Sequence, residues 1–308
     1  MPAEPVTFPL SCHVVANHLA STLLIRRKPP RVASAAGGRS PGCLGIRDAA
    51  RLGLAAVRVL VVLPTYNEAA NIVRILEEVR VALPDASILV VDDSSPDATA
   101  KLAQEAADRL GEIHVVVRPE KNGLGQAYRA GFAWGLERGY EAFVEMDSDF
   151  SHDPAALPAL VAPLSEGVEL AIGSRYVPGG KIPDWSFSRR LLSRGGNIYA
   201  KVLLGLGVED STAGFRAYAA TLLRRIDLGN VRADSYGFQV EMTYLSVLAG
   251  AEIREVPIRF VDRKEGISKM SGHTVTEALS LVTVLGLRRL LQPSRWRRAS
   301  APSSISRV

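Results

Sequence analysis

From residue 57 onward, short apolar runs alternate with segments of helical spacing. VRVLVVL (57–63) and ASILVVDD (86–93) consist mostly of Val, Ile and Leu, which is typical of strands buried on both faces of a parallel sheet. Segment 68–83 spaces its apolar residues as a helix does, and segment 95–110 starts with Ser95, a favoured helix N-cap. Further strands are predicted at 113–118, 141–147 and 168–175, and further helices at 125–139 and 154–164.

Strand and helix alternate five times at the spacing of βαβ units, which predicts an α/β fold with a Rossmann-like, doubly wound and mostly parallel sheet. C-terminal helical elements are predicted near 189–204, 236–249 and 272–291, with a strand at 252–261. The simplest organisation is one domain over 57–291, preceded by a disordered or leader-like extension (1–56) and followed by a basic tail (292–308). In such sheets, ligands bind beyond the carboxyl ends of the strands.

The formal net charge of +5 is concentrated at the two ends of the chain. Seven basic and two acidic residues precede residue 58, and six arginines but no acidic residue follow residue 287, so the part between carries a net charge of −6. The basic balance therefore does not indicate a nucleic-acid-binding core, and we expect no nucleic-acid partner.

Cysteine use and hydropathy limit the cellular setting. The two cysteines, Cys12 and Cys43, lie in the N-terminal extension, so the predicted domain has no disulfide, thiolate metal site or cysteine nucleophile, and a cytoplasmic location fits. No window reaches the roughly 18 to 20 consecutive apolar residues that span a bilayer. Any membrane contact is therefore expected to be peripheral.

Polar residues follow the first two predicted strands. Pro64 should remove a ladder donor and turn the chain out of the sheet, displaying Tyr66 and Glu68 at a helix entrance, although an ordinary turn capped by Asn67 gives the same pattern. Asp92 could accept hydrogen bonds from a base or ribose, and the alternative for this stretch is a helix cap formed by Asp93 or Ser94. The sequence lacks G-x-G-x-x-G after the first strand and has no P-loop motif, which disfavours dinucleotide dehydrogenases and P-loop enzymes.

The stretch EMDSDFSHDP (145–154) crowds acidic residues at the end of a predicted strand. Asp147 and Asp149 can approach one point if the chain bends there. Hard cations such as Mg²⁺ or Mn²⁺ prefer oxygen ligands, and a two-carboxylate site suits a metal that also binds a diphosphate. The alternative is a polar turn in which Asp153 caps a short helix.

Basic residues follow the fifth predicted strand. Arg175 lies at the strand end, and Arg189 and Ser193 are four residues apart on a predicted helix, so that they share a face. Together they could bind a phosphate. Arg190 and Arg194 are expected to point elsewhere, into solvent.

Two later segments also carry polar residues. Asp210, Arg216, Gln239 and Glu241 stand in apolar surroundings and could equally form ion pairs that serve packing. The segment VDRKEGISKMSG (261–272) could close over a phosphate with Arg263, Ser268 and Lys269, or be a surface charge run.

Taken in order, these motifs resemble family 2 glycosyltransferases of the GT-A fold, and within them the polyprenol (dolichol) monophosphate mannose synthases. The resemblance covers about 57–291. Any GT-A enzyme could contain the D-x-D, whereas DSDFSH, GSRY and DRKEGISKM point to the lipid-phosphate mannosyl branch. The matching segments are LPTYNEAANI, VVDDSSPDAT, NGLGQAYRAGFAWG, EMDSDFSHDP, GSRYVPGG, WSFSRRLLSRGGN, DSTAGFRAY, YGFQVEM and VPIRFVDRKEGISKM.

The resemblance implies roles for individual residues. Asp147 and Asp149 would hold Mg²⁺ or Mn²⁺ against the diphosphate of GDP-mannose, and Arg175 would be catalytic with them. The other implied contacts are Pro64, Tyr66, Glu68 and Asp92 with the nucleotide, Arg263 and Lys269 with the donor, and Arg175, Arg189 and Ser193 with the phosphate of a polyprenyl phosphate. Some relatives have Gln where this chain has Ser151, which leaves a third protein ligand open.

The implied reaction is an inverting mannosyl transfer. A phosphate monoester has a second pKa of about 6, so it is largely a dianion at neutral pH. Its oxygen is then already nucleophilic, and no side-chain base is required. Alternatives are a UDP-sugar donor such as UDP-glucose, a nucleotidyltransferase, or a non-catalytic scaffold of the same fold that binds a membrane partner.

We expect peripheral contact with the cytoplasmic face of a membrane. Arginines near the C-terminus would attract anionic lipid, and the resemblance allows an integral-membrane partner protein. The alternative is a soluble closing helix with a disordered basic tail. The residues expected to lie at the membrane interface are Leu279, Val282, Leu285, Leu287, Leu290 and Trp296.

Overall fold

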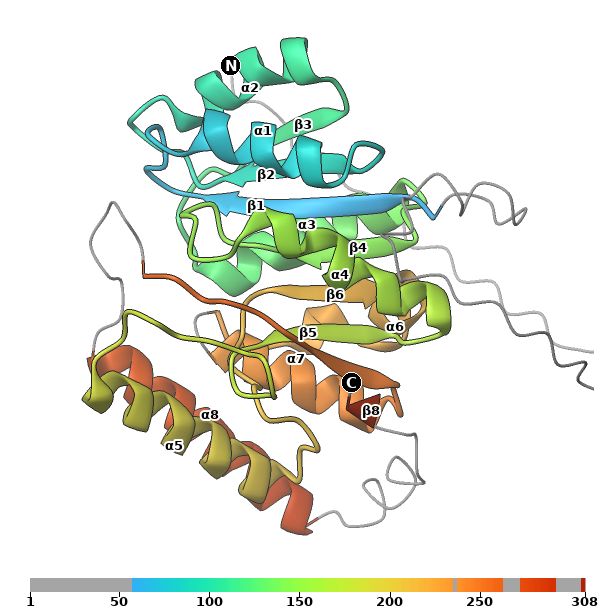
Figure 1. Cartoon of the computed structure of the whole chain (residues 1–308). Helices are drawn as coiled ribbons and strands as arrows, with labels where there is room; N and C mark the ends of the chain where they lie inside the picture. Colours follow the sequence, from blue (N-terminus) through green and yellow to red (C-terminus); the bar gives the residue numbers. More distant parts are fainter. Residues whose placement is uncertain (1–56, 235–236, 263–271, 292–305, 308) are drawn as a thin grey trace, which may run out of the picture. The chain divides into compact units, whose positions relative to one another are not determined.

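The computed structural model describes residues 57–234, 237–262, 272–291 and 306–307. Its centre is an eight-stranded sheet of order β3-β2-β1-β4-β6-β5-β7-β8 (Figure 1). The strands are β1 (Val59–Thr65), β2 (Ser87–Asp92), β3 (Ile113–Val117), β4 (Ala142–Glu145), β5 (Leu170–Ser174), β6 (Arg216–Ala219), β7 (Ile253–Pro257) and β8 (Ser306–Arg307). The predicted α/β fold is confirmed.

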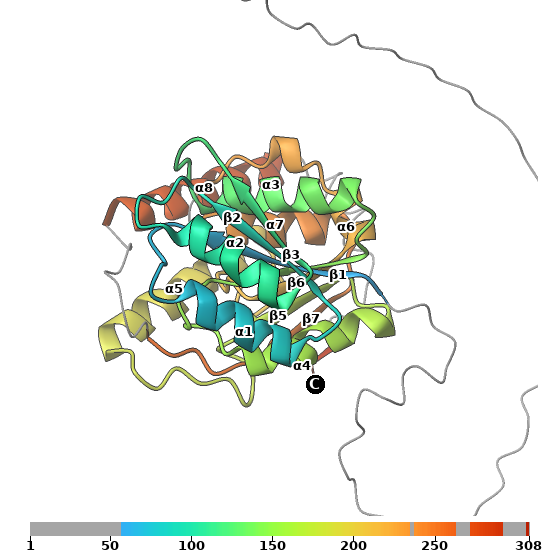
Figure 2. The same cartoon turned by 90° about the horizontal axis from the view of Figure 1, so that it is seen from above.

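Helices cover both faces of the sheet (Figure 2). Helices α1, α2 and α4 pack on one apolar layer of the core, while α3, α6 and α7 pack on the other, joined there by α5 and α8. The helices are α1 (Ile72–Ala82), α2 (Thr99–Leu110), α3 (Leu124–Glu137), α4 (Leu157–Val161), α5 (Phe187–Leu204), α6 (Ala220–Arg225), α7 (Gly237–Leu248) and α8 (Gly272–Leu291), with single 3₁₀ turns at η2 (Pro154–Ala156), η3 (Ala162–Glu166) and η4 (Leu228–Asn230).

One strand runs against the others. β6 pairs antiparallel with both β4 and β5, whereas the pairs β1–β2, β1–β4, β2–β3 and β5–β7 are parallel. The sequence pattern did not predict β6 because its four residues include the charged Arg216 and follow a polar segment. The sheet is therefore mixed but mostly parallel, as expected.

Pro64 does not turn the chain out of the sheet, contrary to expectation. β1 continues to Thr65, and Pro64 pairs in register with Val91 of β2. On the other side of β1, the pairing with β4 ends at Val62 opposite Glu145. A proline is tolerated there because no β4 residue beyond Glu145 is paired with β1.

Ser95 does not cap helix α2, which starts four residues later at Thr99. The Ser95 hydroxyl instead donates to Asp92 and accepts from the backbone of Asn67, so it links two loops at the carboxyl edge of the sheet. Ala98, in the left-handed region at φ 69°, sets the direction of the helix. The Ser95 hydroxyl thus forms hydrogen bonds with Asp92 and Asn67 in place of the predicted N-cap bond.

Helices α5 and α8 lie side by side along one edge of the domain (Figure 1). Tyr199 of α5 and Thr283 of α8 share a hydrogen bond of 2.8 Å. Val282 and Leu285, which we expected at a membrane interface, are buried against the core, whereas Leu279, Leu287 and Leu290 are exposed. Two of these five predicted interface residues therefore belong to the core. Within the residues that the structure describes, no helix is long and apolar enough to cross a bilayer.

Several predictions concern residues outside the described ones. These are the extension 1–56 with its two cysteines, the loop residues Arg263, Ser268 and Lys269, and Trp296.

Candidate active site

The loops after β1 and β2 meet at the carboxyl edge of the sheet. The buried Asp92 carboxylate accepts from the Thr65 hydroxyl at 2.8 Å and from the backbone N–H and hydroxyl of Ser95 at 2.8 and 2.6 Å. The backbone N–H of Glu68 donates to the Thr99 hydroxyl at 2.9 Å. Asp92 therefore fixes the loop that presents Tyr66 and Glu68 directly after Pro64 of β1, and these predicted nucleotide contacts lie together.

A lysine from the third strand end joins this group. The Nζ atom of Lys121 lies 4.0 Å from the ring centre of Tyr66, in a cation–π contact. Lys121 belongs to the loop between β3 and α3, and sequence reasoning missed it. In the sequence, its position shortly after a strand of the parallel sheet is the feature that could have indicated a role at the site.

The D-x-D turn follows the end of β4 at Glu145. Phe150 adopts a left-handed conformation at φ 60°, and the Ser151 N–H donates to Asp149 Oδ1 at 2.9 Å. Asp149 is buried, while Asp147 is half-buried and accepts from the Tyr128 hydroxyl at 3.4 Å. The bend that two converging carboxylates require is thus present.

These acids surround Tyr128 with negative charge. Burial raises the pKa of the Tyr128 phenol well above its usual value, and the charges of Asp147 and Glu145 raise it further. The phenol consequently stays protonated and donates a hydrogen bond to Asp147.

A glycine leaves space beside the D-x-D. A Cβ atom on Gly214 would lie 3.8 Å from Asp147 Oδ2, 3.8 Å from Gln239 Nε2 and 3.9 Å from His152 Cε1. Because Gly214 has no side chain, a small space remains beside the half-buried Asp147 carboxylate, and the Cβ atom of any other residue would fill it. Asp147 beside this space and Asp149 two residues later offer the oxygen ligands that a hard divalent cation prefers, with further ligands from a substrate. Among the described residues, no group of three or more His, Cys, Asp or Glu side chains could hold a metal.

The neighbours of the D-x-D have structural roles. His152 is buried, stacks on Phe215 with ring centres 5.1 Å apart, and meets the edge of Phe260 at 5.3 Å. Asp153 caps the 3₁₀ turn η2 by accepting from the Ala155 N–H at 2.9 Å. The predicted cap is confirmed, and it coexists with the bend at Asp147 and Asp149.

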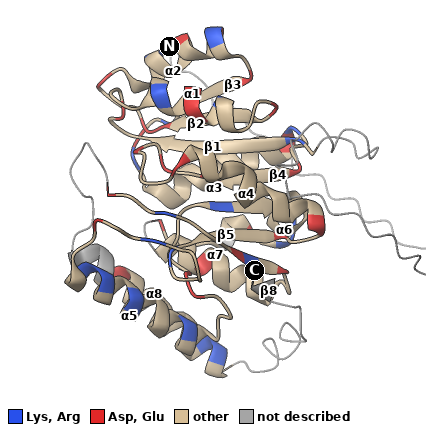
Figure 3. Ribbon diagram, in the orientation of Figure 1, with Lys and Arg blue, Asp and Glu red and all other residues tan. Residues whose placement is uncertain are grey.

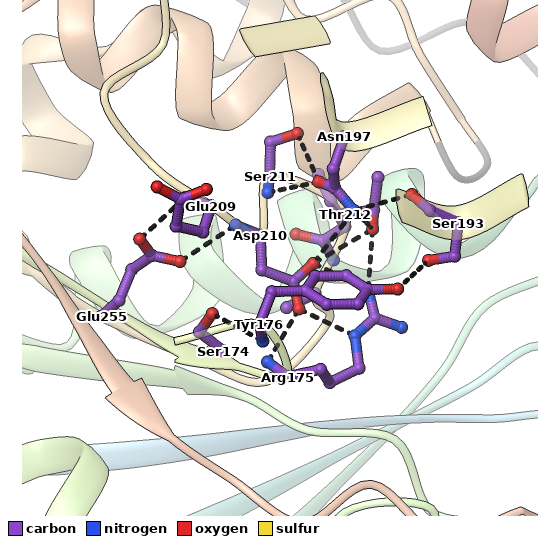
Figure 4. A network of polar contacts seen from close by, with 12 residues as sticks. Ser174, Arg175, Tyr176, Ser193, Asn197, Glu209, Asp210, Ser211, Thr212 and Glu255 are labelled. Atoms are coloured by element: carbon purple, nitrogen blue, oxygen red, sulfur yellow. Dashed lines mark hydrogen bonds and ion pairs between the residues drawn. The ribbon is translucent and has the colours of Figure 1, made fainter. Parts of the chain in front are cut away.

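Arg175 lies directly after β5 and is held by Asp210 (Figure 4). Its Nε and Nη2 atoms donate to the two oxygens of Asp210 at 2.8 and 2.7 Å, and Nη2 also donates to the Thr212 hydroxyl at 2.7 Å. Burial alone would raise the pKa of Asp210, but the positive charge and hydrogen bonds of Arg175 bring this pKa below its ordinary value. Asp210 thus forms a buried ion pair.

The two other predicted phosphate ligands lie nearby. The Tyr176 hydroxyl donates to Ser193 Oγ at 2.7 Å (Figure 4), and the guanidinium carbons of Arg175 and Arg189 lie 5.4 and 4.1 Å from the ring centre of Trp185. Arg189 also forms an ion pair with Asp262 at 2.9 Å. The structure therefore gathers the three residues around two aromatic rings that the sequence did not single out.

The other buried polar residues support the framework. Arg216 is fully buried and donates to the carbonyls of Ala213, Gln239 and Ser211 at 2.7, 2.9 and 2.7 Å. Glu241 accepts from the backbone of residues 232 and 233. Both residues thus serve packing, but through hydrogen bonds to the backbone and not through the expected ion pairs. Arg216 nevertheless matters for the site, because it holds the loop that contains Gly214.

The sequence of this edge matches a known family. The model of glycosyl transferase family 2 matches residues 60–227, which contain the ends of β1 to β5 and the carboxylates of Asp92, Asp147, Asp149 and Asp210. The chain belongs to glycosyl transferase family 2.

Relatives of this family 2 glycosyltransferase cover most of the domain. An undecaprenyl-phosphate mannosyltransferase of Micrococcus luteus is 49% identical over 240 residues, which is 78% of this chain and 96% of the relative. A polyprenol monophosphomannose synthase of Mycolicibacterium smegmatis is 48% identical over 242 residues, 77% of this chain and 90% of the relative.

Solved structures confirm the fold. Glucosyl-3-phosphoglycerate synthase from Mycobacterium tuberculosis has a TM-score of 0.59 at 21% identity, covering 87% of this chain and 88% of that protein. The predicted GT-A architecture is therefore confirmed, and the family and its relatives make this chain a glycosyltransferase.

Proposed function

We propose that this glycosyltransferase transfers mannose from GDP-mannose to a polyprenyl phosphate, giving polyprenyl-phosphate mannose and GDP. The names of these two relatives support mannose as the sugar and a polyprenyl phosphate as the acceptor. The observation that carries the proposal is the arrangement of charge: two carboxylates at the end of β4 and an arginine cluster after β5 occupy loops of the same sheet. One group suits a metal-bound diphosphate and the other suits a phosphate monoester.

The donor would bind over the loops after β1, β2 and β4. Tyr66 and Lys121 would contact the nucleotide, and Glu68 and Asp92 would hold the loop around it, while Arg263 and Lys269 stay predicted donor contacts. Asp147 and Asp149 would bind Mg²⁺ or Mn²⁺. Such a metal would neutralise the diphosphate and stabilise it as a leaving group. A structural relative at 21% identity is described in complex with Mn²⁺ and UDP-glucose, which supports divalent metal use in this fold.

The acceptor phosphate would bind by Arg175, Arg189 and Ser193. One phosphate oxygen attacks C1 of mannose, the bond from C1 to the diphosphate oxygen breaks, and the bonding electrons leave with GDP. The attack inverts the anomeric carbon. No proton needs to be removed from a dianionic phosphate, so the protein's task is to hold two anions close together. Arginine side chains reduce that repulsion.

Helices α5 and α8 would bring the enzyme to the membrane that contains the acceptor. Both helices have exposed apolar residues together with lysine or arginine residues (Figure 3), a composition typical of interfacial helices. This supports peripheral contact, with the cytoplasmic face and an integral-membrane partner as further proposals. The exposed large apolar residues are Phe187, Leu191, Leu192, Ile198, Tyr199 and Val202 on α5 and Leu279, Val284, Leu287, Leu290 and Leu291 on α8.

The decisive experiment is an incubation of the purified protein with polyprenyl phosphate, MgCl₂ or MnCl₂, and labelled GDP-mannose or UDP-glucose. Labelled lipid is expected from GDP-mannose and not from UDP-glucose, and none after chelation of the metal. Asp149→Ala should lower the rate at least about 100-fold, while Asp153→Asn, which alters only the cap of η2, should retain activity. Product from UDP-glucose alone would identify a glucosyltransferase and refute the proposed donor.

A further inference from the structure

A hollow of about 300 Å³ lies along helix α5, and the Tyr176 ring that lines it also lies 5.5 Å from the guanidinium carbon of Arg175. It is lined by Tyr176, Arg194, Asn197, Ile198, Lys201 and Glu209. The sequence predicted Arg194 to be a solvated surface residue that points away from the site. In the structure Arg194 is exposed, as predicted, but its guanidinium carbon lies 5.8 Å from the ring centre of Tyr176, so the side chain lies beside the site and not away from it.

The charges in the hollow are unequal. Lys201 is neutralised by Glu209, with Nζ 2.7 Å from Oε1. Among the described residues, no carboxylate lies within ion-pair distance of Arg194. Arg194 therefore leaves the hollow with one net positive charge, and a guanidinium can bind a phosphate through two parallel hydrogen bonds.

The floor of the hollow is polar and rigid. Asn197 is buried and donates to the Ser193 carbonyl and the Thr212 hydroxyl at 3.1 and 3.0 Å, while its Oδ1 atom accepts from Ser211 (Figure 4). The Tyr176 hydroxyl donates to Ser193 Oγ. The Tyr176 side chain thus contacts Arg194 as well as Arg175 and Ser193, so the hollow adjoins the residues that would bind the acceptor phosphate.

An apolar stripe adjoins the hollow. Residues 187, 191, 198 and 202 fall on one face of α5 by helical spacing, and Ile198 both lines the hollow and belongs to this stripe. The four side chains are 81%, 63%, 55% and 73% exposed. A cation beside an exposed apolar track is complementary to a molecule with an anionic head and a long hydrocarbon chain.

We propose that the hollow is an entry subsite for the polyprenyl phosphate, in which Arg194 binds the phosphate monoester while the isoprenoid chain lies along the α5 stripe. The inference rests on the proposed function, because it assigns a second contact to the same acceptor. The phosphate then passes Tyr176 to reach Arg175 and Ser193. Arg194 is a binding residue for the acceptor and has no role toward the donor.

The test compares Arg194→Gln with Arg190→Gln, a control that removes an equal charge from the same helix. Arg190 donates to the Pro183 carbonyl and does not line the hollow. With labelled GDP-mannose and polyprenyl phosphate in detergent micelles, Arg194→Gln should raise the KM for the acceptor about tenfold and leave the KM for the donor unchanged. Arg190→Gln should change neither constant. Equal melting temperatures would show that both variants fold.

Two further experiments distinguish binding of a phosphate monoester by Arg194 from binding of anionic lipid headgroups. Inorganic phosphate should inhibit the wild-type enzyme competitively against the acceptor, and several-fold more weakly in Arg194→Gln. Flotation with phosphatidylglycerol vesicles that lack acceptor should be equal for the two variants. An unchanged acceptor KM in Arg194→Gln, or a loss of flotation specific to it, would overturn the inference. Absence of mannosyl transfer by the wild-type protein would instead refute the proposed function.

Discussion

Arg175 and Asp210 form a bidentate ion pair in the interior of the site, with Nε 2.8 Å from Oδ2 and Nη2 2.7 Å from Oδ1. Asp210 is fully buried and Arg175 is 9% exposed. The carboxylate takes one edge of the guanidinium, which fixes its orientation. A phosphate bound by Arg175 would meet a different edge of the same group, so the ion pair positions the arginine for an anion.

Removing one charge of this pair should destabilise the protein strongly. Asp210→Asn leaves the Arg175 guanidinium buried without its counterion, which is expected to lower the free energy of unfolding by about 3–5 kcal/mol. Urea denaturation measures the change. Glu169→Gln, which disrupts the outer ion pair of Glu169 and Arg225, should cost less than about 1 kcal/mol. Equal losses in the two variants would contradict a special role for the buried pair.

Glu145 should make stability depend on pH. Burial raises the pKa of its carboxyl from the ordinary 4.5 to about 8, although Arg216, opposite it in β6, lowers this pKa. The folded protein then keeps a proton that the unfolded chain releases near pH 4.5, so stability is greatest below that pH and declines as the pH rises toward 8.

The neutral variant Glu145→Gln tests this linkage. The wild-type free energy of unfolding should fall by up to about 1.4 kcal/mol per pH unit within that window from this group alone. Denaturant titrations at several pH values from 5 to about 8 should give a shallower decline for the variant. Parallel curves for the two proteins would show that Glu145 is ionised in the folded state.

Gly214→Ala should impair activity without unfolding the protein. The added methyl group would make ordinary contacts of 3.8 to 3.9 Å, so stability should change by less than about 1 kcal/mol. The methyl group would nevertheless occupy the gap beside Asp147, and we expect transfer to slow by about 10- to 100-fold.

Gly131→Ala is the matched control for Gly214→Ala. Its Cβ would lie 2.5 Å from Val62 Cγ1, which is too close, so this variant should lose about 1–3 kcal/mol of stability. Thermal melts and rate measurements on both variants separate a packing defect from a site defect. Full activity in Gly214→Ala would show that the gap does not hold substrate.

Exposed residues of α5 and α8 should govern vesicle binding. Val202→Ser and Leu290→Ser each remove an apolar side chain that would lie in the interface, and each should weaken flotation with anionic vesicles several-fold, on the order of 1 kcal/mol. Val81→Ser changes an equally exposed apolar residue on α1, which covers the other face of the sheet, and should bind as the wild type does. Equal binding by all three variants would rule out a membrane face on these helices.

The sequence alone determined the layered architecture and the strand ends that carry the chemistry. Continuous runs of Val, Ile and Leu form strands that need burial on both faces, and the helical segments between them cover those faces. The order β-α-β-α is therefore encoded in the local sequence. Asp147, Asp149 and Arg175 follow such strands, and parallel strands bring their carboxyl ends to one edge. Their position was therefore predictable before their contacts were.

The tertiary structure decided which side chains meet. Asp210 was found with Arg175, Gly214 with Asp147, and Arg194 with Tyr176, in each case from segments whose local pattern gives no register relative to one another. The same holds for β6, whose antiparallel course depends on its neighbours β4 and β5, and for Pro64, which stays in β1 because β4 ends early. The spacing of apolar residues along a helix or strand indicates which of its faces is buried. The residues that pack against that face are set by the folding of the whole chain.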